Sequence, residues 1–183
     1  MSGFPGALYT IIRAVDRFSD ATGKVISLAM LWLVVSISYE CFSRYLFNAP
    51  TVWVLDSSYM TNGSAFMLGC AYALYKGAHV RTDMLYAQFS ERKKGWIDLL
   101  SYVLLFYPAL IVLMVISIDD AWYAYDIQET SEQTAWRPLL WPFRASIPLA
   151  ALLLMIQGVS ETLKAWYRVR FGREFEHREK VEV

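Results

Sequence analysis

Four long stretches of the chain are almost free of charged residues. They cover roughly residues 25–47, 52–75, 99–118 and 143–166. A bilayer core is crossed by about 20 mostly apolar residues in helical form, and each stretch is long enough. A soluble helix bundle would need a polar face on every helix, which the third stretch lacks. The pattern therefore predicts an all-α integral membrane protein with four transmembrane helices.

Two further helices are predicted outside these spans. Residues 4–18 place apolar side chains on one helical face, which predicts an N-terminal amphipathic helix that lies on the membrane surface or packs on the protein. The members of this face are Phe4, Leu8, Ile11, Ile12, Val15 and Phe18. After Thr82 or Asp83 we expect a short interfacial helix between spans two and three. With a cytoplasmic tail over 167–183, residues 1–183 are expected to form a single membrane domain.

The positive charges predict the orientation in the membrane. Of the 17 Lys and Arg, all but three flank the N-terminus, the loop between spans two and three, or the C-terminus. The exceptions are Arg44, Arg137 and Arg144. Because cytoplasmic flanks carry the excess of Lys and Arg, both termini are expected in the cytoplasm and the 119–144 loop outside. That loop is acidic and aromatic, which indicates interfacial anchoring or a docking surface for a soluble partner.

Composition narrows the function. The formal net charge is zero, which gives no case for nucleic acid. Cys41 and Cys70 both lie in apolar runs and the two His are far apart, so neither a disulfide nor a zinc site is expected. No catalytic motif is present, and no two His lie at matched depth for a haem. We therefore expect a protein that is not an enzyme and holds no cofactor.

Ionisable residues at the outer ends of the first two spans predict a polar pairing. Glu40 and Arg44 are four apart in helical register, acid first, and Asp56 opens the second span nearby. We expect Arg44 to bridge Glu40, Asp56 or both. The alternative is an ion or proton site, because ionisable groups inside a membrane are costly and often functional.

Small and amide residues mark candidate helix contacts. They are Gly63, Gly69, Gln157 and Gly158. Glycine permits close helix approach and glutamine can hydrogen-bond across an interface, so these residues are expected to face a larger membrane protein.

Glu161 is expected to reach water near the cytoplasmic end, and Pro108 to kink the third span. The absence of inverted repeats and broken helices favours a scaffold over a complete transport pathway.

A turn is predicted after the second span. Lys76 suits a helix C-terminus and Gly77 the residue just past it. His79 and Asp83 are close enough in sequence to meet across the turn. We expect a structural turn built from Gly77, His79, Arg81 and Asp83.

This turn also carries a family resemblance. The order Gly77-Ala78-His79-x-Arg81-x-Asp83 resembles the pattern typical of the small (Q, DctQ-like) membrane subunit of tripartite ATP-independent periplasmic, or TRAP, transporters. Residues 44–50 followed by Trp53 are similar to that family's first outer turn, and Trp141-Pro142 with Gln157-Gly158 to its fourth span. Asp56 is a departure, since many relatives carry Glu near this point. The resemblance spans roughly residues 10–168.

The resemblance implies a small permease subunit in the bacterial inner membrane. It implies two protein partners besides the lipid bilayer: a large TRAP membrane subunit that holds the substrate and sodium sites, and a periplasmic substrate-binding protein. The implied reaction is sodium-driven uptake of a small organic acid, without ATP. The alternatives from the residues alone are a stand-alone structural subunit or a redox, haem-anchoring one.

Overall fold

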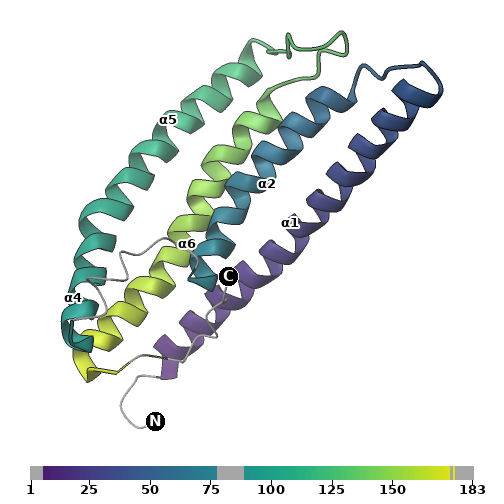
Figure 1. The fold of residues 1–183 in the computed structure, drawn as a ribbon. Coiled ribbons are helices and arrows are strands. Elements are labelled where there is room, and N and C mark those ends of the chain that lie inside the picture. The colour runs from purple at the N-terminus through teal and green to yellow at the C-terminus, as the bar shows by residue number, and fades with distance from the viewer. Residues whose placement is uncertain (1–5, 78–88, 174, 176–183) are drawn as a thin grey trace.

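The computed structural model describes residues 6–77, 89–173 and 175, and long helices make up its architecture (Figure 1). The helices are α1 (Gly6–Leu46), α2 (Val54–Lys76), α4 (Glu91–Ser101), a π-helical turn η1 (Tyr102–Phe106), α5 (Tyr107–Asp126) and α6 (Trp141–Phe171). α4, η1 and α5 follow one another without a break. The prediction of an all-helical protein is confirmed.

The helices form an open row with α6 and α2 in the middle. Figure 1 shows α5, α6, α2 and α1 side by side in that order, and each packs on its neighbour. α1 additionally contacts α6, near the end where α1 begins and α6 ends. We call this the terminal end, and the opposite end, which carries residues 127–140, the loop end. In α6, 39% of the residues in its most apolar stretch are buried inside the protein, whereas in the α4–α5 segment only 6% are. α6 is therefore the central helix.

Polar and small side chains lie on the inner faces of the helices, and large apolar ones on the outer faces. The buried residues of α6 include Ser146, Ala150, Gln157, Ser160 and Glu161. The outer faces of α1, η1 and α5 expose Leu31, Val34, Val35, Leu104, Val112 and Ile116 among others. Small residues let backbones approach closely, while aliphatic side chains match lipid tails. This distribution suits a protein surrounded by hydrocarbon.

Three of the helical segments are long and apolar enough to cross a membrane. They are Leu8–Leu46, Glu91–Asp126 and Trp141–Phe171. α2 has 23 residues, about 35 Å at the α-helical rise, but its composition is more polar. The polar side chains are Asp56, Ser57, Ser58, Thr61, Asn62 and Ser64. A fourth crossing by α2 therefore stays a prediction.

The predicted N-terminal helix is not a separate element. Residues 6–46 form one continuous helix, so the expected boundary between an amphipathic helix and the first span is wrong. Gly23 lies within this helix. The Tyr72 ring of α2 packs where a side chain at Gly23 would stand. Ile12 is 1% exposed, and Ser19 bonds to α6. This segment packs on the protein, as the second alternative had it.

The expected distortion at Pro108 takes the form of a π-helical turn. Pro108 has no N–H to donate to the preceding turn, and the N–H of Tyr107 reaches the carbonyl of Tyr102, five residues back. Helix α6 continues through Pro148. The interfacial helix expected after Thr82 lies outside the described residues.

The fold supports a test of orientation. Gly6 and Phe171 lie at the same end of the row, where the Tyr9 and Phe175 rings are 5.8 Å apart. With the charge asymmetry, this predicts that alkaline phosphatase inserted at Gln133 is active, because the enzyme needs an extracytoplasmic environment. The same insertion after Arg173 should be inactive. Activity at Arg173 and none at Gln133 would reverse the orientation.

Candidate functional site

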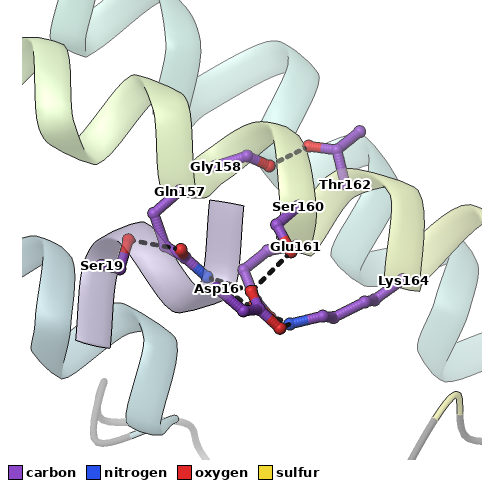
Figure 2. Close-up of polar contacts among 8 residues, drawn as sticks. All are labelled: Asp16, Ser19, Gln157, Gly158, Ser160, Glu161, Thr162 and Lys164. Atoms are coloured by element: carbon purple, nitrogen blue, oxygen red, sulfur yellow. Dashed lines mark hydrogen bonds and ion pairs between the residues drawn. The ribbon is translucent and has the colours of Figure 1, made fainter. Parts of the chain in front are cut away.

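A cluster of six polar side chains joins α1 to α6 at the terminal end (Figure 2). Its members are Asp16 and Ser19 of α1, and Gln157, Ser160, Glu161 and Lys164 of α6. The α6 members recur at intervals of three and four residues, which places them on one helical face. The cluster therefore occupies the crossing of two helices that are far apart in sequence.

Gln157 is the centre of this cluster. Its side chain is 0% exposed. Its Oε1 accepts a hydrogen bond from Ser19 Oγ at 2.7 Å, and its Nε2 donates to Asp16 Oδ1 at 3.1 Å and Glu161 Oε1 at 3.2 Å. Ser160 Oγ also donates to Asp16 Oδ1, at 2.7 Å. The amide thus uses both its donor and its acceptor groups inside the protein.

Lys164 supplies the positive charge for two carboxylates. Its Nζ lies 2.6 Å from Asp16 Oδ2 and 3.1 Å from Glu161 Oε1, with 16% of the lysine side chain exposed. Because an unpaired charge in a low-dielectric site is costly, this ammonium is what makes the two acids tolerable there. The expectation that Glu161 reaches water is wrong: it is 5% exposed and bound by Gln157 and Lys164.

Two of the predicted contact glycines serve contacts within the chain itself. A Cβ on Gly158 would lie 2.5 Å from a Phe106 ring carbon, and one on Gly63 would lie 2.7 Å from the Phe143 ring. Gln157 is buried as well, so these three residues make contacts inside the chain, and a contact with a partner stays a prediction. Gly69 differs, since no atom lies within 4 Å of its Cβ position.

Asp56 anchors the loop of residues 127–140 and does not pair with Arg44. It is 1% exposed and accepts hydrogen bonds from Ser131 Oγ, at 2.6 Å, and from Thr134 Oγ1. The expected Arg44–Asp56 bridge does not appear in the part of the chain that the structure describes. Asp56 lies buried against these loop hydroxyls, whereas the Arg44 side chain is 54% exposed and pairs with Glu40.

Arg44 pairs with Glu40, which is one of the alternatives predicted from the sequence. Arg44 Nε donates to Glu40 Oε1 at 2.9 Å. The other oxygen of Glu40 accepts from the Thr51 backbone N–H at 2.9 Å and from the Thr51 hydroxyl. Glu40 therefore ties the connection between α1 and α2 back to α1.

A second arginine braces the loop end. Arg144 Nη2 donates to Glu129 Oε1 at 2.6 Å, and Nη1 donates to Asp120. The loop closes on itself through Ser131 N–H to the Pro138 carbonyl at 2.8 Å and Leu140 N–H to the Glu129 carbonyl at 2.9 Å. The loop is thus fixed to α2, α5 and α6.

Gly77 ends α2 as predicted. Its φ is +71°, in the left-handed region that favours glycine, and its N–H donates to the Leu74 carbonyl at 3.1 Å. The remaining residues predicted for this turn, His79, Arg81 and Asp83, lie outside the described residues.

Sequence reasoning missed four of the six members of the polar cluster. Gln157 and Glu161 were singled out by their spacing, but Asp16, Ser19, Ser160 and Lys164 were not. The available signal was that Asp16 and Ser19 follow Ile12 at helical spacing, on the face that proves to be buried. In the described ranges, no three His, Cys, Asp or Glu side chains gather so as to hold a metal ion.

Comparison with known proteins identifies one family. The family model for the DctQ component of tripartite ATP-independent periplasmic transporters matches residues 33–168. No curated protein and no solved structure matches the chain. The matched range includes all of α2 and α5 and the four members of the polar cluster that lie on α6. It leaves out the two members on α1, Asp16 and Ser19.

The polar cluster predicts a stability loss on removing its one cation. Lys164→Met should lower the free energy of unfolding by about 1–3 kcal/mol, because the buried carboxylate of Glu161 and the partly buried one of Asp16 lose their shared partner. The measurement is thermal unfolding of the purified protein in detergent. Lys24→Met is the matched control, since that side chain is 74% exposed, and it should unfold like wild type. Equal losses in the two variants would count against the cluster.

The cap at Gly77 predicts a graded response. Gly77→Ala should cost about 1–2 kcal/mol because the left-handed conformation crowds a Cβ, and Gly77→Val should cost more because branching worsens the clash. Gly69→Ala, in open space on the same helix, should not lower the unfolding temperature, because alanine favours a helix more than glycine does. The strain argument fails if Gly77→Val unfolds at the wild-type temperature.

Proposed function

Because the chain belongs to the DctQ family, the small membrane components of TRAP transporters, we propose that it scaffolds the large membrane subunit during uptake of a small organic acid. The large subunit carries the substrate and sodium sites, and a periplasmic binding protein delivers the substrate. The assembly lies in the bacterial inner membrane, with both termini of this chain in the cytoplasm and residues 127–140 in the periplasm.

The observation that supports the scaffold role is that three poorly exposed Lys and Arg side chains are paired with carboxylates of the same chain. A site that binds an organic acid needs a positive charge that is free to pair with it. Arg144, Lys164 and Arg168, whose side chains are at most 26% exposed, each lie within 4 Å of carboxylates of the same chain, with Arg168 Nη1 3.1 Å from Asp98 Oδ2. These charges are used to hold helices together, which supports a structural rather than a substrate-binding role.

The braced outer loop supports contact with the periplasmic partner. Asp56 and Arg144 fix its position from two sides, while Trp136 remains 47% exposed. Aromatic and arginine side chains are enriched in protein interfaces, and Arg137 beside Trp136 is exposed too. A pre-ordered loop loses little conformational entropy when a binding protein docks.

The redox alternative receives no support from the family. The DctQ description is that of a transporter component. Both histidines of the chain, His79 and His177, lie outside the described residues, so no haem pocket can be built around them from the described helices.

Reconstitution tests the proposed role. Liposomes are prepared with this chain and the large subunit, and the binding protein is added with its substrate bound. When a sodium gradient is imposed, these liposomes should accumulate an organic acid. Omitting any one of the three proteins should abolish uptake, and ATP should have no effect. Sodium-driven uptake by this chain alone would refute the scaffold role.

A collapsed sodium gradient is the matched control for the complete system. A sodium ionophore added to the same liposomes should reduce uptake to the level of the incomplete systems. Uptake that survives the ionophore but requires ATP would place the chain in another class of transporter.

A further inference from the structure

One face of α2 is left uncovered by the rest of the chain. α2 lies between α1 and α6 (Figure 1), so its two flanks are packed. The exposed residues Leu55, Tyr59, Asn62 and Phe66 follow one another at intervals of three and four. This spacing puts them on one helical face. We call these four residues, with Gly69, the α2 face.

Asn62 makes this face unsuited to lipid. It is the ninth of the 23 residues of α2, about 12 Å along the helix, so it lies in the middle third of the proposed span. Its side chain is exposed, and none of the described residues gives its carboxamide a hydrogen bond. Hydrocarbon offers no donor or acceptor, so a lipid-facing amide would keep all its hydrogen-bonding capacity unsatisfied.

The other outward surfaces of the protein provide the contrast. The η1–α5 segment exposes Leu104, Leu105, Val112, Val115 and Ile116, and the outer half of α1 exposes Leu28, Leu31, Val34 and Val35. Such aliphatic surfaces are matched to lipid tails. α2 is less apolar than the three segments that are long and apolar enough to cross a membrane. Among the described helices, an exposed carboxamide occurs only on α2.

Gly69 adds room for a close approach on the same side. It lies seven residues after Asn62, two helical turns along the same face. The space around its Cβ position is empty to 4 Å, unlike the space at Gly63 and Gly158. A backbone without a side chain allows a neighbouring helix to come near, which shortens the distance to the Asn62 amide.

We propose that the α2 face docks a transmembrane helix of the large subunit, with a hydrogen-bonding side chain of that helix opposite Asn62. This inference rests on the proposed function, which supplies the partner. It adds which side of the chain faces that partner and which polar group specifies the register. The aliphatic surfaces of α5 and of outer α1 then face lipid.

Photo-crosslinking locates the interface in the intact complex. A benzophenone-bearing phenylalanine analogue is placed at Phe66 on the α2 face, or at Val112 on α5, in membranes that contain all three proteins. Illumination should join this chain to the large subunit from position 66 and give no such product from position 112. Crosslinking from 112 but not 66 overturns the proposed face while leaving the partnership intact.

Two other outcomes distinguish a failure of the docking proposal from a failure of the proposed function. A product of twice the mass of this chain from position 66 would show a second copy on the face, and would overturn the proposal. If the large subunit neither crosslinks at either position nor copurifies with the tagged wild-type chain, the proposed function itself fails, and the docking proposal fails with it.

Asn62 is tested by copurification of the large subunit in mild detergent. Asn62→Leu should weaken retention about threefold to tenfold, the range of one interhelical hydrogen bond. Val112→Leu is the lipid-facing control and should retain the partner like wild type. Asn62→Leu makes α2 more apolar, so its insertion is not at risk. Full retention by Asn62→Leu would overturn the role given to the amide.

Discussion

The hydrogen bonds around Gln157 determine how this protein is put together. In hydrocarbon a polar side chain must find its partner inside the protein, and at this point α6 offers an amide and an ammonium whose further partners, Ser19 and Asp16, come from α1. Asp16 and Ser19 therefore bring the start of α1 across the end of α6. Because α1 also packs on α2 and α2 on α6, this crossing ties one end of the row of helices together, while the loop end is held separately by Asp56 and Arg144.

The same constraint gives meaning to what is left outside. Arg144 at the loop end and Lys164 at the terminal end are paired with carboxylates of the chain, and the outward surfaces of α1 and α5 are mostly apolar. Against that background an exposed amide in the middle of α2 stands apart. A small subunit that exposes such an amide on one face is suited to be built onto a larger membrane protein at that face.

The sequence predicted the elements better than their contacts. The apolar stretches located all four long helices, and the Lys76-Gly77 pair located the end of α2. Local spacing found Gln157 with Glu161 and Glu40 with Arg44, because these partners are four residues apart. It missed Asp16 and misassigned Asp56, since their partners lie more than 70 residues away in sequence. Gly63 and Gly158 lie at close contacts, but no spacing rule reveals that the contacting ring belongs to the same chain.

A double-mutant cycle on Asp16 and Lys164 tests the central claim most directly, because it isolates the coupling between α1 and α6. The free energies of unfolding of Asp16→Asn, Lys164→Met and the double variant are measured in one detergent and compared with wild type. If the cluster holds the crossing, the double variant should lose less than the sum of the single losses, with a coupling energy of about 1–3 kcal/mol. Losses that simply add would contradict the account, because the two residues would then not act on each other.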